Sequence, residues 1–394
     1  MKRTLALFLG LALSAASAFA QMPTPPEVAA KSYILLDLTT GQTLAEREAD
    51  APADPASLTK LMTAYVVFAA LKEHKLTLEQ TLPVSLRAWE ERKGGGSLMF
   101  IEPRMTPKVS DLLRGMIVNS GNDASVVLAE GVAGTVDQFV GMMNRQAQAF
   151  GLKNTSFKNA TGLTESGHQS TARDMAVIAS RIISDFPEYY PIYSTRTYRY
   201  ENAPASNQNN RNVLLLRDPS VDGMKTGYTS AAGYCLVASA QRDFPNLGAT
   251  GAAGGKRRLL SVVLNTASMD ARANESQKLL NWGFQAFDTV RLFEADRAIS
   301  TVPVWKGKSN EAKLGATGAV FVSVPKGEGA KLQTKVERTD PLVAPLQKGQ
   351  KVGMVRVTTA SGAKVAERPL VVLEGVEEAG ILGRAWDALR LWIK

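Results

Sequence analysis

The sequence predicts a mixed α/β domain, then a small all-β domain and a carboxy-terminal amphipathic helix, along 394 residues. Helical patterns dominate residues 55–186, and strand patterns with a closing helix follow as far as residue 287. Short β-like runs separated by glycine and proline turns fill residues 291–373. Residues 381–394 return to a helical pattern. A chain of this length can bury more than one core.

The first twenty residues have the pattern of a secretory signal. Lys2 and Arg3 are basic, Leu5 to Leu13 form an apolar run, and Ala18-Phe19-Ala20 resembles a cleavage site. The apolar run is short for a bilayer span, which needs about 20 residues. We therefore expect residues 1–20 to be a cleaved export signal.

Charge and cysteine content exclude some classes of function. The formal net charge of +9 suits a polyanionic envelope surface, but no basic cluster accompanies it, so nucleic acid is not an expected partner. The single cysteine, Cys235, cannot form an internal disulfide. It lies in an apolar run without a flanking histidine, so we expect a buried structural thiol.

The first domain is expected over residues 28–288. Its expected elements are a hairpin at 30–48, a helix at 55–74, a mostly helical stretch at 76–186, strands at 198–200, 225–229, 234–240 and 259–264, and a helix at 274–287. The helix at 55–74 is apolar on all sides, which predicts that it is buried. The glycine- and alanine-rich segment 244–258 is expected to be a surface loop.

The second domain is expected over residues 291–375 and is predicted to be all β. Its β-like runs are residues 299–304, 319–324, 332–336, 351–358 and 368–372. The domain contains no histidine, no cysteine and no group of residues with a catalytic pattern. Catalytic chemistry is therefore expected in the first domain.

The final segment, residues 377–394, is expected to form an amphipathic helix. Its apolar side would carry Ile381, Leu382, Ala385, Trp386, Leu389, Trp392 and Ile393, and its polar side Arg384, Asp387, Arg390 and Lys394. Basic residues opposite Trp and Leu are typical of a helix in a membrane interface. The alternative is a helix docked on its own domain. We favour the membrane, because two tryptophans at a chain end are costly to leave in water.

Three short motifs occur in one order: Ser57-Leu58-Thr59-Lys60, Ser120-Gly121-Asn122 and Lys225-Thr226-Gly227. Ser57 and Lys60 are three apart at a helix start, so their side chains share one face. The free N–H groups of that helix start can help to hold an oxyanion. A lysine beside a buried helix loses hydration, which favours its neutral form and makes it a plausible base.

The other two motifs add polar groups for proton transfer and binding. The Ser120–Asn122 motif breaks two apolar helical runs, so Ser120 could relay a proton and Asn122 could bind a substrate amide. Lys225 and Thr226 at a strand edge supply a charge and a hydroxyl for a carboxylate, and Gly227 lets a peptide approach. Each motif alone is more often a helix cap, a turn or a solvated strand start. The ordered set is typical of active-site serine enzymes that bind penicillin.

The chain resembles the low-molecular-mass penicillin-binding proteins that act as serine-type D-alanyl-D-alanine carboxypeptidases. Residues 54–63, 119–124, 167–174, 221–229 and 276–284 carry the resemblance, which covers essentially all of the chain after the signal. It implies an α/β fold with a DD-peptidase/β-lactamase-like domain, in which helices flank an antiparallel sheet beside a helical subdomain. A small all-β sandwich domain and a C-terminal amphipathic helix would follow.

The resemblance also implies roles for single residues. Ser57 would attack the carbonyl of the penultimate D-alanine with Lys60 as base, and Ser120 would help to pass the proton to the leaving D-alanine. The backbone N–H groups of Ser57 and Tyr228 would form the oxyanion hole. The residues implied in substrate binding are Asn122, Lys225, Thr226, Gly227, Tyr228 and Arg272, with Arg211 as a further candidate. No metal and no cofactor are implied.

One position departs from the pattern of the family. Many relatives carry histidine after Lys-Thr-Gly, and this chain has Tyr228. Because the oxyanion donor is a backbone group, we expect activity to survive with altered turnover. The resemblance gives His168 no mechanistic role, and we expect its side chain to order its loop.

Three other functions remain as alternatives. A class A β-lactamase needs a glutamate for deacylation, and Glu165 lacks the surrounding Glu-x-x-Leu-Asn pattern. A DD-endopeptidase and a catalytically silent envelope-binding module are the others. The expected partners are peptidoglycan stem peptides, β-lactam antibiotics and, through the C-terminal helix, a membrane surface. The expected place is the periplasmic face of the inner membrane.

Overall fold

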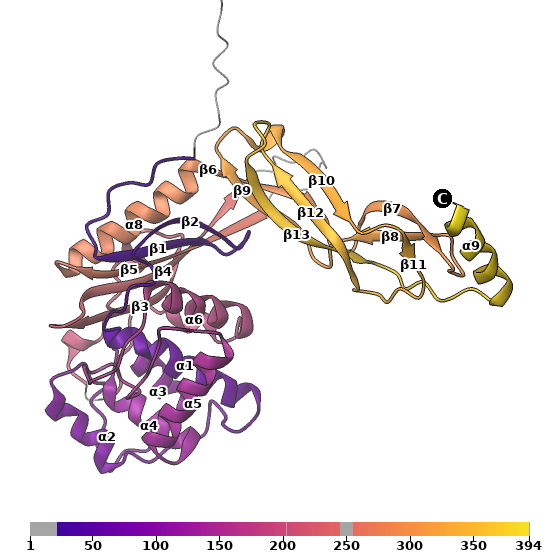
Figure 1. Cartoon of the computed structure of the whole chain (residues 1–394). Helices are drawn as coiled ribbons and strands as arrows, with labels where there is room; N and C mark the ends of the chain where they lie inside the picture. The colour runs from indigo at the N-terminus through magenta and orange to yellow at the C-terminus, as the bar shows by residue number, and fades with distance from the viewer. Residues whose placement is uncertain (1–21, 202, 245–254, 394) are drawn as a thin grey trace, which may run out of the picture.

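The computed structural model describes residues 22–201, 203–244 and 255–393. A second, elongated domain extends to one side of the first, and the terminal helix lies at its far end (Figure 1). The expected export signal at residues 1–20 lies outside the described residues.

The first domain is built on a five-stranded sheet in which every pair of neighbours is antiparallel. In spatial order its strands are β2 (Gln42–Arg47), β1 (Ser32–Asp37), β5 (Gly255–Thr266), β4 (Gly233–Phe244) and β3 (Val221–Thr229). Successive side chains of a strand point to opposite faces, and both faces of this sheet are apolar. Val237 of β4 packs into the larger helical core, and its neighbour Leu236 packs into a second core on the other face.

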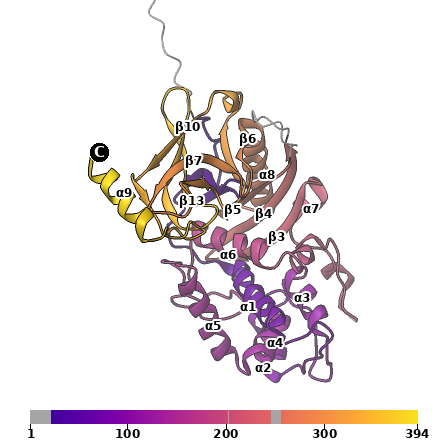
Figure 2. The ribbon, with the colours of Figure 1, turned by 90° about the vertical axis from the view of Figure 1, so that its right-hand side faces the viewer.

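Helices cover both faces of this sheet (Figure 2). The helices of the domain are α1 (Lys60–Lys72), α2 (Leu86–Glu90), α3 (Val109–Ile117), α4 (Asn122–Ala133), α5 (Val136–Ala149), α6 (Ala172–Asp185), α7 (Leu214–Arg217) and α8 (Met269–Ala286). Residues of α1 and α3 to α6 form the larger core with one face, whereas residues of α7 and α8 pack on the other. As expected from its apolar sides, α1 is buried almost throughout.

The structure corrects three expected elements. The helix at 55–74 is a 3-10 turn, η1 (Ala56–Thr59), followed by α1, because Ala56 has φ of +46° and Leu58 N–H bonds to the Pro55 carbonyl at 3.1 Å. The residues at 198–200 form no strand. Instead, Tyr198 donates from its hydroxyl to Asp111 at 3.0 Å, which ties a loop to α3. Of the loop expected at 244–258, Phe244 belongs to β4 and residues 255–258 belong to β5, and residues 245–254 lie outside the described residues.

The second domain contains two packed sheets. The smaller pairs β6 (Phe287–Phe293) with β9 (Val320–Pro325). The larger has the order β10 (Gln333–Arg338), β12 (Lys351–Thr358), β13 (Lys364–Val372), β8 (Glu311–Gly315), β7 (Ala298–Trp305) and β11 (Leu342–Val343). Val322 and Val324 of the smaller sheet pack against Val357 and Ala366 of the larger one, which makes the domain a sandwich.

Polar groups join the two domains. The guanidinium of Arg257 on β5 donates to the Asp37 carboxylate on β1 at 2.7 Å, and the hydroxyl of Ser323 on β9 donates to the same oxygen. Gln42 exchanges two hydrogen bonds with the backbone of Ser323. Each apolar cluster of the described residues lies within one domain, with one exception. Phe287, the first residue of β6, belongs to a cluster of the first domain.

The terminal helix α9 (Ile381–Ile393) is attached to the second domain through its polar side. Asp387 accepts a 2.7 Å hydrogen bond from the backbone of Lys306, and the guanidinium of Arg390 lies 5.4 Å from the ring centre of Trp305. Among the described residues, no single helix has the length and apolar character needed to cross a membrane. Helices α4 and α5 together have that length and apolar character, but their axes differ in direction by 83° at the break between them.

Candidate active site

The nucleophile motif lies where a buried helix begins, beneath the edge strand β3. Ser57 is in the turn η1, and Lys60 is the first residue of α1. Lys60 Nζ lies 3.1 Å from Ser57 Oγ. Leu58, which lies between the two residues, and Leu61, which follows Lys60, are fully buried, so the helix start is held in place by packing. The expected shared face of Ser57 and Lys60 is therefore present.

The Lys60 amine is surrounded by fixed oxygen atoms. It donates to the side-chain oxygen of Asn122 at 2.7 Å and to the Thr161 carbonyl at 2.6 Å. Burial lowers the pKa of Lys60 to about 7, and the more distant carboxylates of Glu91 and Asp123 act in the opposite direction. A neutral amine has two N–H bonds, which these two acceptors occupy. Its lone pair is then left for the hydroxyl proton of Ser57.

The second motif lies between α3 and α4, and it meets the lysine of the third. Lys225 Nζ donates to Ser120 Oγ at 2.8 Å. Ser120 has φ of +62°, a left-handed conformation that is rare outside glycine and turns its side chain into the site. Burial, followed by repulsion from Lys60, Arg272 and Arg211, holds the pKa of Lys225 well below its usual range. Each of the two motif serines thus has a buried lysine amine in contact with its hydroxyl.

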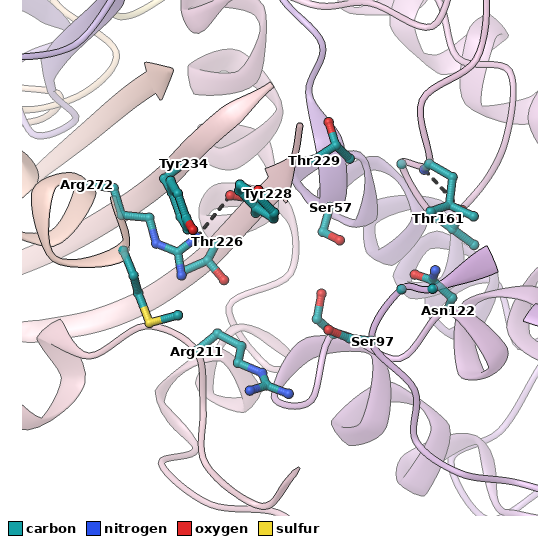
Figure 3. A pocket seen from close by; sticks show the side chains of 17 residues that line it. Ser57, Ser97, Asn122, Thr161, Arg211, Thr226, Tyr228, Thr229, Tyr234 and Arg272 are labelled. Atoms are coloured by element: carbon teal, nitrogen blue, oxygen red, sulfur yellow. Dashed lines mark hydrogen bonds between the residues drawn. The ribbon is translucent and has the colours of Figure 1, made fainter. Parts of the chain in front are cut away.

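The third motif borders a cavity of about 310 Å³ at the edge of the sheet. Thr226, Gly227 and Tyr228 on β3 line it, as do Arg211 and Arg272. Figure 3 shows the two guanidinium groups on the same side as Thr226, away from Asn122 and Thr161. The cavity therefore has a cationic end and an amide-lined end, with Ser57 between them.

The structure brings all ten sequence-predicted site residues together. Eight line the cavity: Ser57, Ser120, Asn122, Arg211, Thr226, Gly227, Tyr228 and Arg272. The remaining two, Lys60 and Lys225, are buried and bond to Ser57 and Ser120, which line the cavity. Within the described ranges, no group of three or more His, Cys, Asp or Glu side chains is placed to hold a metal ion.

Family comparisons agree with this geometry. Residues 19–267 match the family described as D-alanyl-D-alanine carboxypeptidase. The chain belongs to this carboxypeptidase family. Residues 287–378 match the family described as penicillin-binding protein 5, C-terminal domain. The expected fold class, with its peptidase domain and β-sandwich domain, is confirmed.

Two of the individual relatives extend over nearly all of this chain, and a third matches about two thirds of it. D-alanyl-D-alanine carboxypeptidase DacC of Escherichia coli (strain K12) is 42% identical and covers 96% of this chain and 92% of its own. The crystal structure of penicillin binding protein 5 from Haemophilus influenzae has a TM-score of 0.82 at 42% identity, covering 90% of this chain and 100% of that chain. Penicillin-binding protein D2 from Listeria monocytogenes, in its ampicillin-bound form, has a TM-score of 0.56 at 31% identity and covers 67% of this chain and 100% of that chain. The protein is a serine-type hydrolase of the carboxypeptidase class.

In this carboxypeptidase, His168 links the nucleophile turn to the loop behind Lys60. Its Nδ1 accepts a 3.0 Å hydrogen bond from the Lys158 backbone, and its Nε2 lies 2.7 Å from Thr59 Oγ1. Because Nδ1 accepts, the neutral ring carries its proton on Nε2 and donates to Thr59. Burial lowers the pKa of His168, which favours that neutral ring. The side chain lies in the loop-ordering position expected from the sequence.

Two groups that support the site were missed by sequence reasoning. The Thr161 carbonyl binds Lys60 through the backbone, so its side chain gives no signal. Asp123 accepts hydrogen bonds from four backbone N–H groups, those of Met99, Phe100, Ile101 and Ala124, and so ties the segment that follows the cavity-lining Ser97 to the start of α4. An acidic residue directly after the Ser-Gly-Asn motif, in the first turn of a helix, was the available signal.

Two further sequence-predicted residues have contacts that refine their expected roles. Glu165 is exposed, accepts a hydrogen bond from Asn159 at 3.1 Å and does not line the cavity, so no carboxylate of that segment faces Ser57. Arg272 donates to the Gly227 carbonyl at 3.0 Å and so braces the edge strand as well as facing the cavity. Burial lowers the pKa of Arg272 to about 10, which leaves it charged at neutral pH.

Proposed function

We propose that the chain removes the terminal D-alanine from pentapeptide stems of peptidoglycan through an acyl-enzyme on Ser57. The observation that carries this proposal is the environment of Lys60. Its amine is 3.1 Å from Ser57 Oγ, its two N–H bonds have fixed acceptors, and its pKa is lowered to about 7. A lysine in that state is a general base matched to neutral pH.

In the acylation step, Ser57 Oγ forms a bond to the carbonyl carbon of the penultimate D-alanine while Lys60 takes the hydroxyl proton. The carbonyl oxygen becomes an oxyanion, which the backbone N–H groups of Ser57 and Tyr228 would stabilise. When the C–N bond breaks, the departing amine needs a proton. Ser120, which is in contact with Lys225, is placed to pass that proton from the lysine pair.

Binding of the leaving residue is assigned to the cationic end of the cavity. Thr226, Arg211 and Arg272 face that end, and the Nε of Arg211 is buried without a hydrogen-bond partner among the described residues. A carboxylate would supply the missing acceptor. Water then enters and hydrolyses the ester of Ser57. A β-lactam acylates the same serine, and its retained ring fragment would slow the hydrolysis.

The assignment of Ser57 is tested by mass spectrometry after incubation with benzylpenicillin. One adduct is expected, on the peptide that contains Ser57, and Ser57→Ala should form none. Ser97→Ala is the matched control, because Ser97 lines the same cavity, and its adduct should persist. Release of free D-alanine from a pentapeptide stem is then measured with the wild-type protein. An adduct on another residue, or no release of D-alanine, would overturn the proposal.

We further propose that residues 1–20 export the protein and that α9 rests on the periplasmic face of the inner membrane. The polar side of α9 is attached to the second domain, whereas its apolar side chains are turned outward. Those that are exposed are Ile381, Leu382, Trp386, Leu389 and Trp392. A helix that presents Trp and Leu to its surroundings and holds Arg384 half-buried beside Glu378 fits an interfacial membrane position.

The membrane proposal is tested by co-sedimentation with vesicles of phosphatidylethanolamine and phosphatidylglycerol. The full chain after residue 20 should sediment with the vesicles, and the double variant Trp386→Ser, Trp392→Ser should remain largely in solution. Leu216→Ser is the control, because Leu216 is equally exposed but lies on α7 of the first domain. Equal sedimentation of the tryptophan variant and the wild type would contradict the proposal.

A further inference from the structure

The cationic end of the cavity has an apolar wall that the proposed reaction on D-alanine does not need. Tyr228, Tyr234 and Met269 line the cavity beside Arg211 and Arg272. Tyr228 is 52% exposed and Met269 is 49% exposed, so both present large apolar surfaces to water at this end. Figure 3 shows Tyr228 between Tyr234 and Ser57, facing the open part of the cavity.

The ring of Tyr228 is held in one orientation. It stacks on Tyr234 with a centroid distance of 4.3 Å and an interplanar angle of 29°. Tyr234 in turn lies under the guanidinium of Arg272, at 5.6 Å, and Arg272 is bonded to the Gly227 carbonyl. A stacked ring loses little further freedom when a ligand covers its other face, which makes Tyr228 a preorganised binding surface.

The position of this wall follows from the proposed function, on which this inference rests. If the carboxylate of the leaving amino acid binds at the arginine end, its side chain is bonded to the same α-carbon and lies within a few ångströms of that carboxylate. The methyl group of alanine covers little of a tyrosine ring or a methionine side chain. A longer apolar side chain would cover more of both and remove them from water.

We propose that Tyr228 and Met269 form a specificity wall that lets the enzyme release carboxy-terminal D-amino acids with apolar side chains larger than methyl. The substrate class is a stem peptide that ends in D-Ala-D-Xaa, where Xaa is leucine, methionine or a residue of similar size. The bond that breaks and the proton transfers are those of the D-alanine reaction. Only the side chain of the leaving residue differs.

The test compares diacetyl-L-Lys-D-Ala-D-Leu with diacetyl-L-Lys-D-Ala-D-Ala as substrates of the full chain. The measured quantity is the ratio of kcat/KM for the two peptides, which cancels general losses of activity. In the wild type the ratio should lie within about tenfold of one, and Tyr228→Ala and Met269→Ala should each lower it by about tenfold. Leu216→Ala removes an equally exposed apolar side chain outside the cavity and should leave the ratio unchanged.

The outcomes separate this inference from the proposed function. If the wild type releases no D-alanine, the proposed function and the specificity wall are both refuted. If it releases D-alanine but not D-leucine, or if neither Tyr228→Ala nor Met269→Ala changes the ratio, only the specificity wall is refuted. Met269 is the first residue of α8 and Tyr228 lies on β3, so the two variants change the wall from two different elements.

Discussion

The substitution Asn122→Asp should move the pH dependence of acylation to alkaline pH. In the native site, Lys60 has a pKa of about 7. About half of the amine is then neutral at pH 7, against about one part in 3,000 for an amine with the ordinary pKa of 10.5. The new carboxylate would stand where the side-chain oxygen of Asn122 accepts from Lys60, at 2.7 Å. An opposite charge at that distance raises the pKa of an amine by about 1 to 3 units.

A shift of one unit lowers the neutral fraction at pH 7 from about one half to about one eleventh, and a shift of three units lowers it to about one thousandth. We therefore expect acylation of Asn122→Asp at pH 7 to be about 5- to 500-fold slower than in the wild type. Much of the loss should be recovered at pH 9 to 10, where the amine is again deprotonated. The second-order rate of acylation by a fluorescent penicillin, followed by stopped flow between pH 5 and 10, measures both effects.

Asn122→Ala is the matched control, because it removes the same hydrogen bond without adding a charge. Its rate should fall, since Lys60 loses an oriented acceptor, but its pH midpoint should stay near or below that of the wild type. Thermal unfolding of both variants shows whether they remain folded. If Asn122→Asp lowers the rate by the same factor at every pH, Lys60 is not the titrating base and the reasoning fails.

Two other predictions follow from the same region. Gly162→Ala should strongly reduce penicillin labelling, because Gly162 has φ of +87° and a Cβ there would lie 1.8 Å from the Ala56 carbonyl oxygen. Gly167→Ala is the control. Gly167 also has a positive φ, of +77°, but a Cβ there would meet only the flexible end of the Lys158 side chain, at 3.1 Å. Equal labelling of the two variants would contradict the prediction. Stability should rise with pH between about 7 and 10, because Lys60 in the unfolded chain still binds a proton that the folded state has released. Urea unfolding should show this slope, and Lys60→Met should reduce it; an unchanged slope would mean that Lys60 is charged in the folded protein.

The grouping of the candidate catalytic residues was predictable because they belong to short motifs with fixed local geometry. Ser57 and Lys60 are one helical turn apart, so the spacing alone places them together. Lys225 and Ser120 are in contact although more than one hundred residues separate them in the chain. Local spacing cannot predict such a contact, so only the resemblance to a family could place the two motifs in one site. The Thr161 carbonyl gave no signal, because a backbone acceptor can belong to any residue type.

The errors in the fold have physical causes as well. The Tyr198–Tyr200 segment has the composition of a strand, but the pairing beside it is limited to an isolated bridge between Thr197 and Asn209, and the hydroxyl of Tyr198 ties the segment to Asp111. Strands β6, β8 and β11 were not predicted, and β6 begins at Phe287, where a helix was expected to end. Strand β8 contains alanine, lysine and glycine, and β11 is only two residues long, so neither shows a clear alternation.

The polar junction between the domains makes each one separable. Asp37 would keep Arg257 and the N–H groups of Thr39 and Thr40 as partners even without the second domain, and would lose only the Ser323 hydroxyl. Among the described residues, Phe287 on β6 and the edge-to-face pair of Phe244 and Phe321, with ring centres 6.2 Å apart, supply apolar contact across the junction, but no large apolar core would be cut open by the division. A catalytic unit of this kind can therefore acquire or shed its β module by recombination without redesign of its interior, so the two halves are free to evolve as independent building blocks.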